Sequence, residues 1–363
     1  MQKHAIFLAY IVIFTYLCSR FISMDKLSLI RKPVEQEFLL FDQLYESTLR
    51  SDNPLLNEVL THTALHRGKQ LRPLLTLLAA KICNPVTQKT LQTAVALELL
   101  HTATLMHDDV VDNSPTRRGL PSVQAQWSNK VAVLVGDYLL AKVIGITADI
   151  RNGKILSIVA HLGQMLSSGE LLQLHAGGSM WITEEQYFKI IDQKTAQLFQ
   201  ACMEAGAESA GCTQRQRTAL REFGRLFGLC FQMKDDIFDY SDSEEIGKPT
   251  MNDIRDGKVT LPLIISLQRA PREEAEHIRT LAEALATHDE HINAHNAEEE
   301  IKSLVMRYQG ITYTQQKMEQ LRAQAVALLD IFHTPYPADS MTARPTPKGS
   351  LLQLLNYAIN RLY

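Results

Sequence analysis

The stretch His101-Thr-Ala-Thr-Leu-Met-His-Asp108-Asp109-Val-Val-Asp112 ends an apolar, helix-forming run in a group of carboxylates. Asp108 and Asp112 are four residues apart, so on a helix they lie one above the other on the same face. Two such carboxylates repel each other, and a bound cation would relieve the repulsion. Mg²⁺ commonly binds through one or two carboxylates together with phosphate oxygens and water. The stretch therefore indicates either a metal site or a solvated acidic helix end.

A second copy of the pattern favours the metal site. Asp235-Asp236-Ile-Phe-Asp239 also follows an apolar, helix-forming run. Gln232, Asp235 and Asp239 are spaced i, i+3 and i+7, which places them on one helix face. Two helices of this kind, facing each other, would enclose a cavity with an acidic mouth and an apolar interior.

The rest of the chain is also helical in its hydrophobic period. We find no convincing strand alternation, so the sequence predicts an all-α fold of roughly ten or more helices. The segments predicted to be helical are 35–49, 74–82, 87–112, 131–148, 155–174, 183–199, 215–240, 261–267, 275–286, 301–308, 314–332 and 351–363. The segments predicted to be loops are 113–119, 241–257, 287–300 and 333–350. His288, His291 and His295 are interpreted as part of a solvated connection rather than as a metal site.

Composition excludes several classes of protein. The 363 residues are 45% hydrophobic and carry a net charge of −3, and they contain no zinc-finger, P-loop or dinucleotide motif, so a nucleic acid is not expected as a partner. The five cysteines are scattered without metal-ligand spacing: Cys18, Cys83, Cys202, Cys212 and Cys230. This pattern predicts free thiols in a reducing compartment rather than a disulfide framework.

The N-terminus is considered apart from the fold. Ala5 to Cys18 is nearly all apolar but short for a membrane-spanning helix, which needs about 20 residues. A membrane anchor, a secretory signal and an extension upstream of a start at Met24 all fit this run. We favour Met24 as the beginning of a single domain over 24–363, with residues 1–23 as an extension. The expected location is the cytoplasm, with membrane association through a weak anchor as the second choice.

Basic residues accompany the acidic clusters. Arginine suits bidentate phosphate recognition and lysine suits point-charge contacts. Each basic residue alone is more often a surface or core side chain, but together with the carboxylates they predict a site for a phosphorylated, apolar substrate chelated by Mg²⁺. The candidates are Lys69, Arg72, Arg117, Arg118, Lys194 beside Thr195, Lys248 and Lys258.

Taken in order, these motifs resemble those of the trans-isoprenyl diphosphate synthases, or polyprenyl synthetases. The resemblance is dense over residues 40–270 and is carried by the following motifs: Gly68-Lys-Gln-Leu-Arg-Pro73, Leu100 to Asp112, Arg117-Arg-Gly119, Gly136-Asp-Tyr-Leu-Leu140, Lys194-Thr195, Phe231 to Asp239, and Gly247-Lys248 with Asp253 and Gly257-Lys258. It implies the isoprenoid synthase fold, a large single-domain helical bundle around a central apolar cavity. It also implies a homodimer.

The resemblance implies a Mg²⁺-dependent prenyltransferase, which ionises an allylic diphosphate (farnesyl or geranyl) and adds isopentenyl diphosphate units to it. By motif match the metal ligands would be Asp108, Asp112 and Asp235, supported by Asp109, Asp236 and Asp239. Isopentenyl diphosphate would be bound by Lys69, Arg72, His101 and Arg118. The allylic diphosphate would be bound by Arg117, Lys194, Thr195, Gln232, Lys248 and Lys258.

Two residues depart from the family pattern. Gln70 stands where a basic residue is common, and Met251 stands where a glycine is common. Chain length is expected to depend on Ala103 and Thr104, five and four residues before Asp108, because short-chain members are similar but carry aromatic plugs there. Both residues are small here, which resembles medium- and long-chain synthases and predicts a product of C30 or longer.

Three alternatives stay open at this stage. The first is a short-chain farnesyl or geranylgeranyl diphosphate synthase. The second is a terpene cyclase, which shares the first acidic motif but usually carries an Asn/Ser/Glu pattern in place of the second. The third is a non-catalytic subunit of a heteromeric synthase, which usually lacks one acidic cluster or the basic residues.

Overall fold

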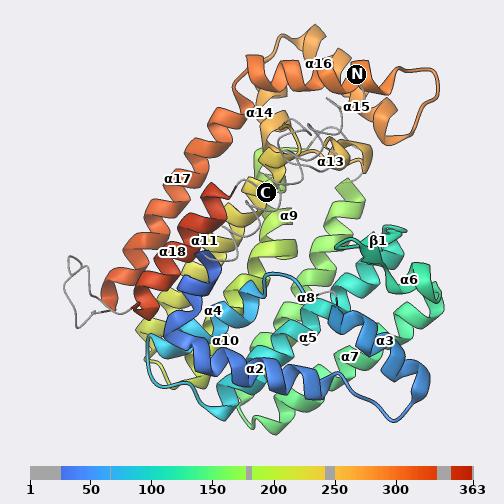
Figure 1. Cartoon of the computed structure of the whole chain (residues 1–363). Coiled ribbons are helices and arrows are strands. Elements are labelled where there is room, and N and C mark those ends of the chain that lie inside the picture. The colour runs from blue at the N-terminus through green and yellow to red at the C-terminus, as the bar shows by residue number, and fades with distance from the viewer. Residues whose placement is uncertain (1–25, 66, 177–181, 242–249, 333–344, 362–363) are drawn as a thin grey trace, which may run out of the picture.

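The computed structural model describes residues 26–65, 67–176, 182–241, 250–332 and 345–361. These parts form a helical bundle in which long helices run side by side (Figure 1). The first half contains η1 (Lys32–Val34), α2 (Glu35–Thr48), α3 (Pro54–Leu65), α4 (Leu71–Lys81), α5 (Gln88–Val111), α6 (Val123–Gln126), α7 (Asn129–Asp149) and α8 (Gly153–Ala176). The second half contains α9 (Glu184–Ile191), η2 (Asp192–Ala196), α10 (Gln197–Ser209), α11 (Gln214–Phe238), α13 (Asn252–Arg255), α14 (Leu261–Arg269), α15 (Arg272–Ala286), α16 (Ala294–Arg307), α17 (Gly310–Leu328), η3 (Leu329–Ile331) and α18 (Pro347–Asn360).

Helix starts follow capping chemistry that the sequence carries. Thr87 caps α5, and its side chain and that of Thr90 each accept from the other residue's backbone N–H. Thr183 caps α9 in the same reciprocal way with Gln186. These pairs satisfy backbone N–H groups that a helix start leaves without a partner. The predicted start of the 74–82 helix after Pro73 is slightly late, because α4 begins at Leu71 and accommodates the proline in its first turn.

All four loop predictions need correction. The predicted 241–257 loop contains the short helix α13, and the predicted 333–350 loop ends early because α18 begins at Pro347. The predicted 113–119 loop contains a small antiparallel hairpin, β1 (Thr116–Arg117) and β2 (Leu120–Pro121). Its two turn residues, Arg118 and Gly119, have φ of +54° and +82°, as a tight two-residue hairpin turn requires. The predicted 287–300 loop ends early, because α16 begins at Ala294, where the Asn293 side chain caps it.

Buried apolar side chains form two cores that α11 connects. Phe223 and Phe227 of α11 belong to a core with α2, α4, α5, α7, α8, α10 and α18. Met233 and Ile237, further along α11, belong to a second core with α9 and α13 to α17. Figure 1 places α15 and α16 at the opposite end of the bundle from α2. The second acidic cluster therefore lies on a helix that both cores hold in place.

The prediction that all the cysteines are free thiols is wrong for one pair. Cys83, after α4, and Cys212, before α11, form a disulfide between residues 129 positions apart, with their Cα atoms 5.7 Å apart. Cys202 and Cys230 are free and buried. Sequence spacing did not reveal the pair because helix packing, not chain proximity, brings the two loops together. The remaining cysteine, Cys18, lies outside the described residues together with the whole 1–23 segment.

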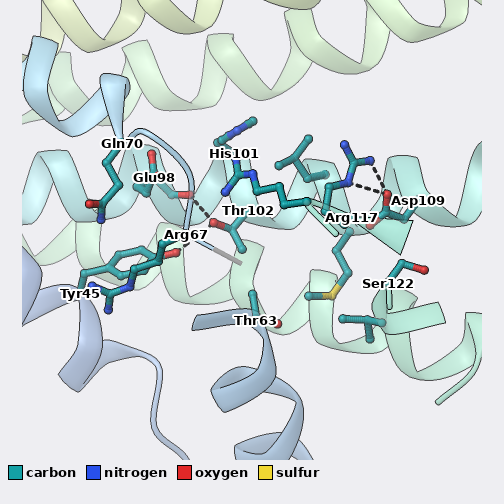
Figure 2. A pocket seen from close by; sticks show the side chains of 14 residues that line it. Tyr45, Thr63, Arg67, Gln70, Glu98, His101, Thr102, Asp109, Arg117 and Ser122 are labelled. Atoms are coloured by element: carbon teal, nitrogen blue, oxygen red, sulfur yellow. Dashed lines mark hydrogen bonds and ion pairs between the residues drawn. The ribbon is translucent and has the colours of Figure 1, made fainter. Parts of the chain in front are cut away.

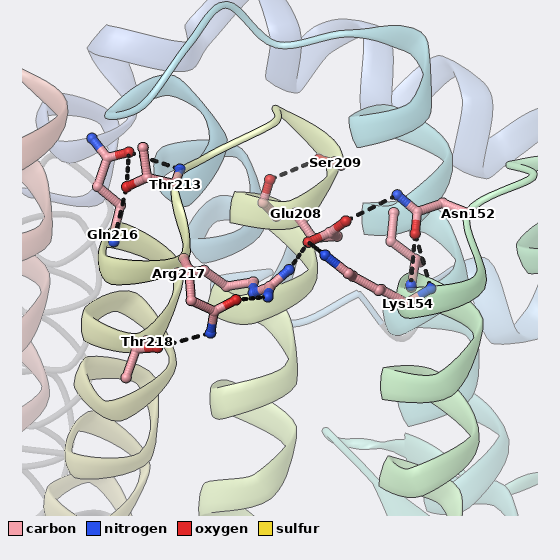
Figure 3. A network of polar contacts seen from close by, with 11 residues as sticks. Asn152, Lys154, Glu208, Ser209, Thr213, Gln216, Arg217 and Thr218 are labelled. Carbon is pink, nitrogen blue, oxygen red and sulfur yellow. Dashed lines mark hydrogen bonds and ion pairs between the residues drawn. The ribbon is translucent and has the colours of Figure 1, made fainter.

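A polar network holds the neighbouring helix ends. Glu208, near the end of α10, accepts from Arg217 of α11 and from Asn152, whose Nδ2 lies 3.3 Å from its Oε1. Lys154, in the first turn of α8, lies 3.8 Å from the same carboxylate (Figure 3). Three helices are thus joined at one carboxylate.

Candidate active site

The first acidic cluster stands at the end of α5, and its three carboxylates have different surroundings. Asp109 is buried and accepts from Arg117, whose Nε lies 2.8 Å from Asp109 Oδ1. Asp112 is the exposed C-cap residue. Burial, with repulsion from Glu170 of α8 and from Asp112, raises the pKa of Asp108 to about 6. This concentration of negative charge fits a site that gains from a cation.

The second acidic cluster ends α11. Asp236 is buried, and its carboxylate accepts from the hydroxyl of Tyr187 and from Nε2 of Gln232 at 2.8 Å. Burial and the nearby Asp253 carboxylate raise its pKa well above the ordinary value. Asp239 accepts from the backbone N–H groups of Asn252 at 2.9 Å and Asp253 at 3.1 Å, which fixes the start of α13.

Asp109 and Asp236, the middle aspartates of the two clusters, therefore accept hydrogen bonds from neighbouring side chains, and Asp239 accepts them from the backbone. Asp108 and Asp112 are the members of the first cluster that face a less crowded environment. The third predicted metal ligand, Asp235, accepts from Arg361 Nη2 at 2.7 Å. The assignment of Asp108, Asp112 and Asp235 as metal ligands stays a prediction.

Lys194 and Thr195 lie in η2, a single π-helical turn. π-helical turns inside α-helices are frequently functional, because they redirect side chains. Lys194 Nζ lies 2.8 Å from a carboxylate oxygen of Glu170 and 3.1 Å from Gln173 Oε1. Thr195 donates to Gln232 Oε1 at 2.8 Å. Since Gln232 in turn donates to Asp236, a chain of polar contacts leads from Lys194's turn to the second cluster.

A pocket joins these groups. We call it the acidic pocket, and it is lined by Gln173, Ala176, Ile182, Tyr187, Ile190, Ile191, Lys194, Thr195, Gln232, Asp236, Asp253, Gly257, Lys258, Val259 and Thr260. Lys258 donates to Asp256 at 2.9 Å. Burial lowers the pKa of Lys258, but Asp256, Asp253 and Asp112 outweigh that effect and raise it. The influence of Asp112 shows that the loop after the second cluster lies within electrostatic reach of the first.

A second pocket lies between α2, α3, α5 and the β1–β2 hairpin, and we call it the basic pocket (Figure 2). It is lined by Tyr45, Thr63, Arg67, Gln70, Glu98, His101, Thr102, Leu105, Met106, Asp109, Arg117, Arg118, Ser122 and Val123. His101 is buried, and burial together with the charges of Arg72 and Arg118 lowers the pKa of its imidazole well below the ordinary value. His101 is therefore neutral at pH 7, and its uncharged imidazole can still donate a hydrogen bond to an anion.

Arg118 is placed by a close backbone approach. A Cβ on Gly68 would lie 2.7 to 2.9 Å from three atoms of the Arg118 guanidinium, so the absence of a side chain at this position lets the arginine lie against the Gly68 backbone. The Gly68 loop and the hairpin, 50 residues apart, are thus fitted together at one of the residues expected to bind isopentenyl diphosphate.

The other predicted basic residues are placed less uniformly. Arg72 is half-buried and does not line the basic pocket. Its Cζ lies 5.2 Å from the centre of the Phe199 ring, and burial lowers its pKa despite the nearby Glu98 carboxylate. Lys69 Nζ lies 5.4 Å from the centre of the Tyr357 ring of α18. Lys248 lies outside the described residues.

The two departures from the family pattern have structural counterparts. Gln70 donates from Nε2 to Asp42 Oδ1 at 3.1 Å, so an amide serves there as the partner of a carboxylate. Met251 has φ of +62°, a left-handed conformation that favours glycine, and its side chain is buried. Ala103 is fully buried and Thr104 half-buried on α5, and neither lines the acidic or the basic pocket.

Several site residues were missed by sequence reasoning. Tyr187, Glu170, Gln173 and Glu98 contact or line the pockets and received no role. Asp253 was part of a quoted motif but received no role, and burial next to Asp239 raises its pKa to about 6. Glu170 and Gln173 carried a usable signal, because polar residues at i and i+3 in an otherwise apolar helix share one face.

The arrangement fits a divalent metal carried by the substrate. Within the described ranges, no group of three or more His, Cys, Asp or Glu side chains is arranged to enclose a metal ion. The three histidines His288, His291 and His295 are among the residues that this statement covers. A Mg²⁺ that keeps water and phosphate ligands needs only one or two protein carboxylates. Asp108, Asp112 and Asp235 are the carboxylates predicted for this role, and none of them lines the acidic or the basic pocket as described.

The helical bundle with its acidic and basic pockets defines an isoprenoid synthase fold. A crystal structure of a polyprenyl synthase from Caulobacter crescentus, complexed with calcium and isoprenyl diphosphate, has a TM-score of 0.81 to this chain at 32% sequence identity. The match covers 93% of this chain and 98% of the other.

The chain belongs to the polyprenyl synthetase family, whose model matches residues 53–299. It is 35% identical over 332 residues to the all-trans-nonaprenyl-diphosphate synthase (geranyl-diphosphate specific) of Rhodobacter capsulatus, covering 91% of this chain and 96% of that protein. It is 33% identical over 284 residues to the octaprenyl diphosphate synthase of Escherichia coli, covering 78% of this chain and 86% of that one. The resemblance found in the motifs is confirmed.

Proposed function

We propose that this chain is a long-chain, all-trans polyprenyl diphosphate synthase. It would condense an allylic diphosphate, farnesyl or geranyl, with successive isopentenyl diphosphates to a product of C30 or longer. The observation that carries the proposal is the path of polar contacts from Glu170, which lies near Asp108, through Lys194 and its η2 turn to Asp236 of the second cluster. The basic pocket is a separate group of cationic side chains. The long-chain relatives above support the choice of product class.

The carboxylates would hold Mg²⁺ together with the allylic diphosphate. The predicted ligands are Asp108, Asp112 and Asp235. Bound Mg²⁺ supplies Lewis-acid stabilisation of the charge that develops on the leaving diphosphate. The chain's own contribution is position, since Tyr187 and Gln232 hold Asp236 in place and so fix the last turns of α11.

The basic groups would bind the two diphosphates separately. Lys194, Thr195 and Lys258 line the acidic pocket and would contact the allylic diphosphate beside the metal. His101 and Arg118 line the basic pocket, with Arg72 within electrostatic reach of His101, and would hold isopentenyl diphosphate. Arg117, which was predicted to contact the allylic diphosphate, lines the basic pocket instead. Two anions held by the remaining groups of the two pockets can be aligned for carbon–carbon bond formation.

The product-length proposal rests on α5. Its side chains before Asp108 would line the path of the growing tail, and Ala103 and Thr104 are both small. Thr104→Phe is the cleaner test, because Thr104 is only half-buried, whereas a large residue at the fully buried Ala103 would overpack the core by about 1–3 kcal/mol. Thr104→Phe should shorten the product to C15–C20, and Thr104→Val, which keeps the size, should leave it long. An unchanged product in Thr104→Phe would contradict the tail path.

The function as a whole is tested with the purified chain alone. Farnesyl diphosphate, labelled isopentenyl diphosphate and Mg²⁺ are incubated with it, and the dephosphorylated products are sized. Products of C30 or longer support the proposal. Products of C15 or C20 would identify a short-chain synthase, cyclic hydrocarbons a terpene cyclase, and no turnover a non-catalytic subunit.

We propose further that the chain forms a homodimer through α7 and α8. Large apolar side chains are exposed on both helices: Val133, Leu134 and Ile144 on α7, and Leu156, Leu171 and Leu174 on α8. Large exposed apolar residues that gather on one surface mark interaction sites. By length and mean hydropathy (1.8 and 1.2) these two helices could also cross a bilayer, but helices that pack in a soluble bundle pass the same test.

The dimer proposal is tested by mass. The Val133→Lys/Ile144→Lys double variant, altered at positions eleven residues and three turns apart on one face, should be a monomer in sedimentation velocity. A monomeric wild type would contradict the dimer. The proposed location is the cytoplasm with peripheral membrane contact, and cell fractionation with and without residues 1–23 tests it.

A further inference from the structure

Arg361 is the C-cap residue of α18, the last helix of the chain. Its side chain is only 7% exposed. Nη2 donates to Asp235 Oδ1 at 2.7 Å and to the backbone carbonyl of Phe231 at 2.9 Å. The guanidinium also lies 3.8 Å from the centre of the Phe231 ring. Three contacts therefore fix this arginine to the second half of α11.

The partner of this buried arginine is a functional residue. Asp235 is the first carboxylate of the second cluster and the only one of that cluster predicted to bind metal. Its side chain is 43% exposed although the arginine that holds it is buried. Arg361 is thus a buried, fixed donor to a carboxylate that stays partly open to solvent. Hydrogen-bond partners of this kind orient metal ligands in proteins.

The same helix also contacts a residue that is predicted to bind isopentenyl diphosphate. Tyr357 lies four residues before Arg361, so the two share one face of α18. Its ring lies 5.4 Å from Lys69 Nζ, a residue expected to bind isopentenyl diphosphate. One face of the C-terminal helix thus contacts a residue of each diphosphate site, although α18 is more than 100 residues from either acidic cluster in sequence.

We propose that Arg361 is a positioning residue for the metal–diphosphate site and that it acts by orienting the carboxylate of Asp235. This inference rests on the proposed function, because the metal and the diphosphate belong to that proposal. It adds the C-terminal helix to the set of elements that complete the site. Arg361 itself does not touch the reacting atoms.

The test measures binding and not only turnover. Titration calorimetry with Mg²⁺ and inorganic pyrophosphate compares the wild-type chain with Arg361→Met, Arg361→Lys and a control, Arg322→Met. Arg322 is a suitable control because it too joins α18 to a neighbouring helix: its Nη1 on α17 lies 3.3 Å from Asn356 Oδ1. It is partly exposed and does not line either pocket. Loss of a residue that orients a metal ligand typically weakens metal binding by about 10- to 100-fold.

We expect Arg361→Met to weaken Mg²⁺-dependent pyrophosphate binding about tenfold. The affinity of Arg361→Lys should lie between those of Arg361→Met and the wild type, and Arg322→Met should bind with the wild-type affinity. The Mg²⁺ concentration for half-maximal turnover should shift in the same order. Equal or tighter binding by Arg361→Met overturns the inference, and tighter binding would mean that Arg361 competes with the metal. Should Arg361→Met not fold, unchanged binding by Arg361→Lys overturns it. If the wild type itself does not bind, the proposed function fails instead.

Discussion

Replacing Gly68 by alanine tests whether the close approach of Arg118 matters for substrate binding. The new Cβ would lie 2.7, 2.8 and 2.9 Å from three guanidinium atoms of Arg118. Ordinary contacts of this kind are about 3.5–4.0 Å, so the guanidinium must retreat by about 1 Å. Because the obstructing group is the far end of a flexible side chain, we expect little loss of stability and a misplaced arginine.

The kinetic effect follows from the contact that Arg118 is expected to make. A hydrogen bond between a charged donor and a phosphate oxygen contributes about 1.5–3 kcal/mol. Weakening it by displacement should raise KM for isopentenyl diphosphate by about 10- to 100-fold, since 1.4 kcal/mol corresponds to a factor of ten. KM for the allylic diphosphate should change much less, because Lys194 and Lys258 lie in the other pocket.

The assay is steady-state turnover with isopentenyl diphosphate varied at saturating primer, together with thermal unfolding. Gly153→Ala is the matched control, because a Cβ at that exposed position would have nothing within 4 Å. An unchanged KM for isopentenyl diphosphate in Gly68→Ala would refute the reasoning. So would an equal rise for both substrates, or a rise that Gly153→Ala reproduces.

Three further predictions concern stability. Asp108→Asn should stabilise the substrate-free protein at pH 7, because folding raises the pKa of Asp108 to about 6 and so penalises its charged form. Allowing for the partial exposure of this side chain, the expected gain is about 1–2 kcal/mol. Measured by urea unfolding, the gain should shrink as the pH falls from about 6 to 4. Tyr187→Phe should cost about 1–3 kcal/mol in the same assay, because the buried Asp236 carboxylate loses a donor. A reducing agent should lower the unfolding midpoint by breaking the Cys83–Cys212 disulfide, which closes a long loop.

Each of these predictions has a control. Asp52→Asn, at an exposed position, should leave stability unchanged at every pH. Tyr308→Phe removes a hydroxyl that donates to Glu274 near the surface and should cost less than Tyr187→Phe. The Cys83→Ser variant should unfold at the same midpoint with and without reductant. The first prediction is contradicted if Asp108→Asn is no more stable than the wild type. The second is contradicted if Tyr187→Phe is as stable as the wild type, and the third if reductant does not change the unfolding midpoint of the wild type.

The sequence by itself determined the helices and the chemical types of the site. Local rules were sufficient for these. A period of 3.6 residues defines the helices, Thr87 and Thr183 define two of their starts, and i, i+4 spacing puts Asp108 and Asp112 on one face. The left-handed conformation at Met251 was not predicted, because a methionine rarely adopts it.

Only the tertiary structure decided which side chains hold the carboxylates and cations in place. Tyr187 reaches Asp236 across 49 positions, and Arg361 reaches Asp235 across 126. Nothing in the spacing of such residues predicts these pairs, because they depend on how helices pack and rotate against one another. The Cys83–Cys212 disulfide was not predicted, for the same reason. The sequence therefore specified what the site is made of, and helix packing specified how its charges are paired and oriented.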